Sequence, residues 1–259
     1  MFDNKKQSAV FIDIDGTLMG HSKAALAENL GVIQKLRSLG HKFFICTGRA
    51  NSYIPKFLDT EKNFDGIITG AGAYVSIGKR VISKQLMPFE AVEKVCRFFA
   101  DNKVHGVLEG EKNMYFFETT CFNEDDWIKL DPENLPKLIT QDTPILKFTV
   151  DGKFPDGFEE LLGDGYTFLQ HPDYGEVIRK EYSKSEGIRT ALGVLGIPAE
   201  QSIAIGDSLN DLDMIEYAGI GVAMGNGTDE IKHAADFVTD STDNAGVAKA
   251  LRKIYDLHE

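Results

Sequence analysis

The first third of the chain alternates short apolar runs with segments whose apolar residues recur at helical spacing. Residues 9–12 are apolar throughout, which is typical of a parallel strand buried on both faces. Residues 22–39 carry apolar positions three and four apart, and a second apolar run follows at 42–46. A helix-like stretch at 50–60 then leads to a third strand at 66–69. This order predicts β-α-β units in a parallel sheet.

The same alternation returns at the end of the chain. The pattern there predicts helices at 186–196, 209–217, 228–235 and 244–256, with strands at 202–205, 220–223 and 236–238. We expect the two blocks to form one Rossmann-like core around a parallel sheet.

The middle of the chain has a different pattern. It predicts a helix at 88–102 and strands at 104–109, 114–119, 145–150, 166–170 and 174–179. Neighbouring strands joined by short turns favour antiparallel pairing, which needs no crossover. The fold class is therefore α/β. Residues 1–83 and 182–259 form the parallel-sheet core, and residues 84–181 form an inserted α+β domain with an antiparallel sheet.

Composition narrows the classes of function. The 259 residues include 28 Lys and Arg against 40 Asp and Glu, for a net charge of −12, and basic residues never form a run of five or six. Nucleic acid and anionic membranes are therefore not expected as partners. The sequence has no apolar run of membrane-spanning length, and Cys46, Cys96 and Cys121 form no C-x-x-C pair. We expect a soluble cytoplasmic protein, as a monomer or small homo-oligomer, with free thiols.

Three polar clusters directly follow predicted parallel strands. They are Asp13-Ile14-Asp15-Gly16-Thr17, Thr47-Gly48-Arg49 and Gly206-Asp207-Ser208-Leu209-Asn210-Asp211. Because ligands bind outside the carboxyl ends of strands in such sheets, all three are expected at one edge. Each cluster alone is typical of a turn or a helix cap. Three of them on strand ends, with Lys184 after the insert, favour a functional site.

The residue types in these clusters suit phosphate chemistry. Carboxylates gathered at one edge repel one another unless a cation holds them, and Asp and Asn oxygens are hard ligands that suit Mg²⁺. A carboxylate can also attack phosphorus and form an aspartyl phosphate. Phosphoryl transfer needs groups that neutralise charge, for which Thr47 and Lys184 are candidates.

In order and position, these motifs resemble the four motifs of the haloacid dehalogenase superfamily of phosphohydrolases, and more narrowly its Cof-like members with a type IIB cap. The resemblance covers nearly the whole chain. The first to fourth motifs correspond to residues 13–17, 47–49, Lys184 and 206–211, with further matches at 223–226 and 244–248.

The resemblance implies roles for the first motif. Asp13 would be the nucleophile, and Asp15 would be the general acid for the leaving group and then the general base for water. Relatives that use the phosphoenzyme for ion pumping carry Thr at the second position. The carboxylate of Asp15 therefore fits hydrolysis or mutase chemistry.

The resemblance also implies ligands for Mg²⁺ and for the phosphoryl group. The Asp13 side chain, the Asp15 carbonyl and Asp207 would bind Mg²⁺, with Asn210 and Asp211 in supporting positions. Lys184 would also restrain Asp13. The phosphoryl oxygens would be held by Thr47, Gly48, Lys184 and Asn210.

One departure from the family pattern concerns Ala71. Many relatives have Asn-Gly-Ala where this chain has Ala71-Gly72-Ala73, so any contact made by that Asn is absent. Residues 70–75 also partly match the dinucleotide fingerprint G-x-G-x-x-G. That motif is not favoured, because its last glycine is missing and the segment follows the third strand.

The inserted domain would act as a lid that selects the leaving group. Its candidate contacts are the turn at 109–113 and the residues His171, Tyr174 and Glu176, although each of them taken singly is more typical of a solvated turn.

The sequence thus predicts a Mg²⁺-dependent phosphohydrolase that acts on a small phosphorylated metabolite, with a sugar phosphate as the expected substrate, through an aspartyl phosphate. A phosphomutase of the same superfamily and a sugar-phosphate-binding regulatory protein without turnover are the alternatives.

Overall fold

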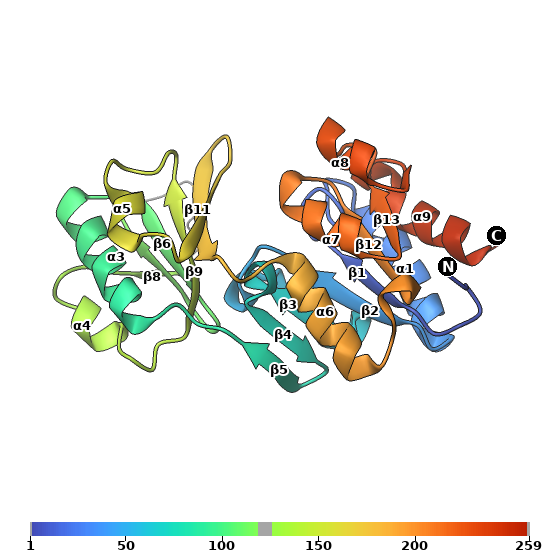
Figure 1. The fold of residues 1–259 in the computed structure, drawn as a ribbon, viewed down its shortest axis with the longest axis horizontal. Helices are drawn as coiled ribbons and strands as arrows, with labels where there is room; N and C mark the ends of the chain where they lie inside the picture. Colours follow the sequence, from blue (N-terminus) through green and yellow to red (C-terminus); the bar gives the residue numbers. More distant parts are fainter. Residues whose placement is uncertain (1, 119–125, 258–259) are drawn as a thin grey trace. The chain divides into compact units, whose positions relative to one another are not determined.

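The computed structural model describes residues 2–118 and 126–257 (Figure 1). The chain divides into two compact units. The core unit comprises Met1–Gly48, Lys56–Lys84 and Ser183–Glu259, and the inserted unit comprises Arg49–Pro55 and Gln85–Tyr182. No helix in this described part of the chain is both long and apolar enough to cross a membrane.

The core unit is built on a mixed, mainly parallel sheet with the order β14-β13-β12-β1-β2-β3-β4-β5. Strands β14 to β3 pair in parallel, whereas β4 and β5 add antiparallel strands at one edge. The strands are β1 (Ala9–Ile12), β2 (Lys42–Cys46), β3 (Gly66–Thr69), β4 (Tyr74–Ile77), β5 (Arg80–Lys84), β12 (Ser202–Gly206), β13 (Ile220–Ala223) and β14 (Phe237–Val238). This sheet confirms the predicted parallel core.

Helices cover both faces of the core sheet. Phe11 and Phe44 face α6 and α7, whose Ile188 and Met214 share their apolar cluster. Alternate strand residues such as Ile12 are buried on the opposite face, where α1 packs against α9. The helices are α1 (Lys23–Ser38), α2 (Thr60–Asn63), α6 (Lys184–Leu195), α7 (Leu212–Tyr217), α8 (Asp229–Ala234) and α9 (Gly246–Tyr255).

The helix predicted at 50–60 is wrong. This stretch instead forms two short 3₁₀ turns, η1 (Asn51–Tyr53) and η2 (Lys56–Leu58), followed by α2. Pro55 disfavours helical torsions in the residue before it, and Ile54 is extended at φ −74° and ψ 129°. Asp59 adopts φ +43°, which also interrupts a helix.

The segment Arg49–Pro55 belongs to the inserted unit because it is bonded to β6. The Ala50 amide donates to Glu109 Oε2 at 3.2 Å, and the Ser52 hydroxyl donates to the Gly110 carbonyl at 2.6 Å. The residues that directly follow Thr47-Gly48 are therefore held by the inserted unit.

The inserted unit contains a second sheet with the order β10-β11-β9-β6-β7-β8 (Figure 1, green to yellow). Its pairings are antiparallel, as predicted, except that the short β8 runs parallel to β7. The strands are β6 (Gly106–Gly110), β7 (Met114–Phe117), β8 (Ile128–Lys129), β9 (Ile145–Asp151), β10 (Tyr166–Gln170) and β11 (Tyr174–Arg179). The predicted end of one strand at 119 and the predicted thiol Cys121 lie outside the described residues.

Three helices cover one face of this second sheet: α3 (Phe89–Asn102), α4 (Leu135–Leu138) and α5 (Phe158–Leu162). The ring of Phe99 lies 5.4 Å from that of Phe158 and 5.7 Å from that of Phe117. A Cβ atom at Gly106 would lie 2.3 Å from the Phe99 ring, so glycine lets the helix approach β6. Phe148 and Val150 of β9 belong to this apolar cluster, whereas Lys147 and Thr149 point to the opposite face, away from these helices.

Ala71 has a left-handed backbone conformation, which is unfavourable for a residue other than glycine. Ala71 has φ +53°, where a Cβ atom costs energy, whereas Ala73 has φ −63°. We expect Ala71→Gly to raise the free energy of unfolding by up to about 1 kcal/mol, and Ala73→Gly to lower it by about 0.5–1 kcal/mol. Urea unfolding of both variants measures the difference. Equal losses of stability in the two variants would contradict a strained left-handed Ala71.

Candidate active site

The predicted carboxylates meet where the strand order of the core sheet reverses. Strands β1 and β12 are parallel neighbours, and Asp13 and Asp207 directly follow them. The Asp13 amide donates to the Ile205 carbonyl at 3.1 Å, which extends the ladder by one residue. Ligands of open parallel sheets bind at such a switch point.

Lys184 ties the third motif to the first and the fourth. It is the first residue of α6, where the side chain of Ser183 caps the helix. Its Nζ atom lies 2.8 Å from Asp13 Oδ1, 2.5 Å from Asp211 Oδ1 and 3.3 Å from Asn210 Oδ1. The lysine is only 1% exposed. Residues from the first and fourth motifs thus meet around the ammonium group of the third.

Asp211 is fully buried and engaged through both carboxylate oxygens. While Oδ1 accepts from Lys184, Oδ2 accepts from the amides of Asp207 at 2.9 Å and Ser208 at 3.1 Å. A Cβ atom at Gly206 would lie 2.5 Å from the Asp211 Cβ atom, so glycine is required there. Asp211 therefore fixes both the lysine and the loop that carries Asp207.

Asp207 is held from the first motif. Its Oδ1 accepts from the Thr17 hydroxyl at 2.8 Å. Gly16 lies against the same carboxylate at φ +73°, and a Cβ atom there would be 2.3 Å from Asp207 Oδ2. Between these contacts, Asp15 is exposed and forms an isolated β-bridge with Met19.

The electrostatics of the site favour a bound cation. Burial raises the pKa of Asp13 to about 8, although the neighbouring Lys184 acts in the opposite direction. Burial also raises the pKa of Asp207 to about 6, against the hydrogen bond from Thr17. For Lys184, burial is outweighed by Asp13 and Asp211, which hold its pKa well above the usual value.

The donor set fits a hard divalent ion. Carboxylate oxygens of Asp13, Asp207 and Asp211 all lie within 4.8 Å of one another. Such oxygens suit Mg²⁺, and a positive charge there would favour the ionised form of the two carboxyl groups whose pKa is raised.

Thr47 lies at the same edge of the sheet, directly after β2. It is 1% exposed, its amide donates to the Ile68 carbonyl at 2.9 Å, and its carbonyl accepts from the Ala71 amide at 3.1 Å. Gly48 is the last residue of this stretch that belongs to the core unit.

In the inserted unit, three of the predicted contact residues meet around a lysine that sequence reasoning missed. Lys147 forms ion pairs with Glu109, at 3.4 Å, and with Glu176, whose Oε2 lies 3.2 Å from His171 Nε2. The Thr149 hydroxyl donates to Glu109 Oε1 at 2.6 Å. We call these five residues the Lys147 cluster.

Strand pairing builds the Lys147 cluster. Glu109 lies opposite Lys147, and Glu176 lies opposite Thr149, on the sheet face away from α3. Burial raises the pKa of Glu176, but Lys147 and the hydrogen bond with His171 outweigh it and lower this pKa to about 2. One lysine between the apolar residues Leu146 and Phe148 of β9 was the sequence signal for this cluster.

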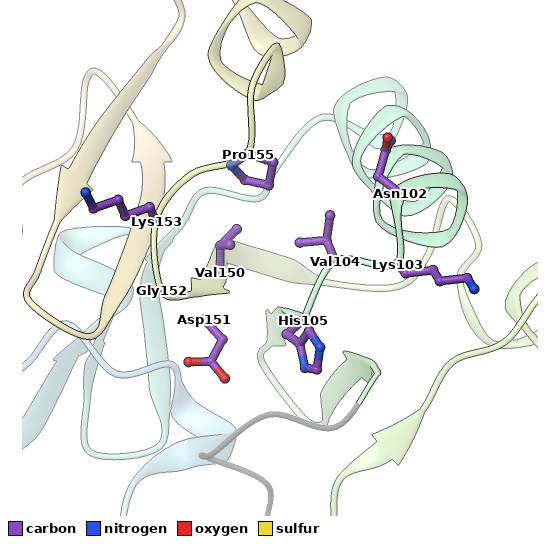
Figure 2. A pocket seen from close by; sticks show the side chains of 9 residues that line it. All are labelled: Asn102, Lys103, Val104, His105, Val150, Asp151, Gly152, Lys153 and Pro155. Atoms are coloured by element: carbon purple, nitrogen blue, oxygen red, sulfur yellow. The ribbon is translucent and has the colours of Figure 1, made fainter.

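Figure 2 shows a pocket in the inserted unit that contains none of the predicted site residues. The side chains of Lys103 and Lys153 lie on opposite sides of it and point away from each other, so they do not converge on one ligand. The lining residues are Asn102, Lys103, Val104, His105, Val150, Asp151, Gly152, Lys153 and Pro155.

The core sheet has an aspartate paired with a lysine at its switch point, and an α+β insert interrupts the chain that forms this sheet. Together these features define a phosphoryl-transfer enzyme. Residues 10–251 match the model of the haloacid dehalogenase-like hydrolases, and the chain belongs to that family. It is a phosphatase of the Cof-like branch that acts on small phosphorylated compounds.

Two relatives illustrate this likeness. The chain is 28% identical over 271 residues to 5-amino-6-(5-phospho-D-ribitylamino)uracil phosphatase YitU of Bacillus subtilis (strain 168), covering 97% of this chain and 99% of that protein. It is 27% identical to the subclass IIB sugar phosphatase BT4131, with a TM-score of 0.81, covering 97% of this chain and 100% of that structure.

The raised pKa values of Asp13 and Asp207 predict how the response of the protein to added Mg²⁺ should depend on pH. A carboxyl group whose pKa is higher in the folded than in the unfolded protein binds more protons when folded. The metal-free protein should therefore lose stability as pH rises from about 4 to about 8, and the increase in Tm caused by Mg²⁺ should grow over the same interval. Thermal unfolding with and without Mg²⁺ measures this, with Asp207→Asn as the variant that should lose the metal response. An increase in Tm of the same size at low and high pH would contradict this prediction.

The Lys147 cluster predicts a stability effect. Lys147→Met leaves Glu109 and Glu176 buried without their cation, and should lower the free energy of unfolding by about 3–5 kcal/mol. The exposed Lys153 is the matched control. Lys153→Met should change the free energy of unfolding by less than about 0.5 kcal/mol. Denaturant unfolding compares the two. Similar changes in the free energy of unfolding in both variants would contradict a stabilising role for the ion pairs of Lys147.

Proposed function

We propose that the protein is a Mg²⁺-dependent phosphatase that hydrolyses a sugar phosphate through a covalent phosphate on Asp13. The observation that carries the proposal is the placement of Asp13. It is buried at the switch point, restrained by Lys184 at 2.8 Å and adjacent to Asp207, while the exposed Asp15 lies two residues further along the chain.

In the first step, a carboxylate oxygen of Asp13 attacks the phosphorus atom of the substrate. The bond between phosphorus and the ester oxygen breaks, and Asp15 donates its proton to that oxygen, so the sugar leaves as a neutral alcohol. An exposed carboxyl group suits this role, because it can exchange its proton with water between the steps.

In the second step, Asp15 accepts a proton from water as the water oxygen attacks phosphorus. The bond between phosphorus and the Asp13 oxygen breaks, inorganic phosphate leaves, and Asp15 regains the proton that it donated. Asp13 returns as a carboxylate beside Lys184.

The remaining groups neutralise and orient the phosphoryl group. We assign its oxygens to Thr47, Gly48, Lys184 and Asn210. Mg²⁺ would be bound by the Asp13 side chain, the Asp15 carbonyl and Asp207, and would supply positive charge where phosphoryl oxygens gather. Asp211 supports the site by holding Lys184.

We assign the choice of substrate to the inserted unit. The Lys147 cluster carries two carboxylates and one lysine, so its net charge disfavours an anionic leaving group, while its many donors and acceptors suit hydroxyl groups. A neutral, hydroxyl-rich leaving group is also consistent with relatives named as sugar and ribityl phosphate phosphatases.

The proposal predicts that turnover depends on Asp13. Asp13→Asn and Asp15→Asn should each lower kcat for sugar phosphates by roughly 10³-fold or more, because each removes a group that reacts. Phosphate release from a panel of sugar phosphates, nucleotides and cofactor phosphates in Mg²⁺ measures this. Asp229→Asn, an exposed change in α8, is the control that should retain activity.

Two results would overturn the proposal. Full activity in Asp13→Asn would remove the covalent mechanism. Transfer of phosphate to another hydroxyl of the sugar, with none released to water, would identify a mutase.

A further inference from the structure

The loop that carries Asp15 is fastened at one carbonyl group. The Gly16 oxygen accepts from Asn226 Nδ2 at 2.8 Å and from the Thr242 hydroxyl. Asn226 follows β13, and Thr242 begins the 3₁₀ turn η6 (Thr242–Asn244) after β14. We call these two side chains the Gly16 clamp. They come from a part of the chain more than 200 residues away from Gly16 in sequence.

Gly16 needs such a fastening because it must be glycine. Its φ of +73° and its approach to Asp207 leave no room for a side chain. Glycine is also the residue whose backbone rotates most freely. The conformation that the site requires is therefore not secured by the residue itself.

The clamp completes the restraint of Gly16 on both sides. The Gly16 amide donates to the Met19 carbonyl at 3.2 Å, which holds the peptide plane shared with Asp15. The clamp holds the next peptide plane through the Gly16 oxygen. With both planes fixed, neither the carbonyl nor the side chain of Asp15 can swing by rotation about Gly16.

The two members of the clamp orient each other. The Thr242 amide donates to Asn226 Oδ1 at 2.8 Å, so the Asn226 amide nitrogen is the end that faces Gly16. The Thr242 hydroxyl has Asn226 Oδ1 and the Gly16 oxygen within reach, and its single proton serves one of them at a time.

Residues next to Asn226 and Thr242 form further hydrogen bonds to the segments that carry Asp207 and follow Asp15. Thr228, two residues after Asn226, donates its amide to the Asp207 carbonyl at 2.9 Å. Asp243, next to Thr242, accepts from the amides of His21 and Ser22 at 2.7 and 2.9 Å, where α1 begins. The loops after β13 and β14 thus brace the loops that carry Asp207 and Asp15.

We propose that Asn226 and Thr242 are positioning residues for Asp15, which they hold in its reactive orientation through the Gly16 carbonyl. This inference rests on the function proposed above. Neither side chain touches the reacting atoms. Their removal should therefore slow the chemical steps, while Thr47 and Lys184 should still bind the phosphoryl group.

The test compares Thr242→Val, Thr242→Ser and Asn226→Ala with the wild type. Val keeps the shape of Thr without its hydroxyl, and Ser keeps the hydroxyl. We expect Thr242→Val and Asn226→Ala to lower kcat by about tenfold or more with KM within about twofold, since small misplacements of catalytic groups have effects of this size. Thr242→Ser should stay within about threefold of wild type.

The control is Asn244→Ala. Asn244 lies in the same turn and donates to Asp240 at 3.0 Å without contacting Gly16. It should retain wild-type kcat. Two results would overturn the inference and indicate general damage to the turn. One is a loss of activity in Asn244→Ala equal to that in Thr242→Val. The other is a decrease in kcat that parallels the decrease in Tm across all variants.

Amide hydrogen exchange in the metal-free protein gives a second measurement that needs no turnover. The amides of Gly16, Leu18 and Met19 close the Asp15 loop, and they should exchange faster in Thr242→Val and Asn226→Ala but not in Asn244→Ala. Unchanged exchange with unchanged kcat would overturn the inference. A wild-type protein that releases no phosphate from any substrate would instead overturn the proposed function, while faster exchange confined to this loop would still support the clamp.

Discussion

A single buried ammonium group organises the active site. Lys184 is withdrawn from water, and a charge in that position is tolerated only when it is paired and hydrogen-bonded. Its partners, Asp13 and Asp211, lie in the segments that follow two neighbouring strands, β1 and β12. Because Asp211 also binds the amides of Asp207 and Ser208, the requirement to pair one lysine sets the shape of the fourth motif.

Charge explains why an acidic protein can bind an anionic substrate. The net charge of −12 would repel a phosphate ester, and three of the carboxylates gather at the site itself. Burial raises the pKa of Asp13 and Asp207, so the site favours a cation that relieves their repulsion. In the proposed mechanism, Mg²⁺ and Lys184 reverse the local field, and the phosphoryl group then enters a positive environment.

The sequence was sufficient for features that depend on parallel strands, because their carboxyl ends meet at one edge and bring distant motifs together. It failed at 50–60, where apolar spacing suggested a helix that Pro55 interrupts. The polar edge strand β5 and the two-residue β8 carry too weak a pattern to be predicted. Lys147 and Asn226 were missed as members of clusters because their partners are set by strand register and loop contacts, which spacing along the chain does not reveal.

In the proposed mechanism, phosphate becomes covalently attached to Asp13. The most direct measurement is a rapid acid quench of the enzyme with a sugar phosphate that it hydrolyses, followed by mass spectrometry of its peptides. We expect a transient phosphate on the peptide that contains Asp13, formed before free phosphate and absent in Asp13→Asn. Phosphate release with no labelled peptide at any time, or with the label on another residue, would contradict it.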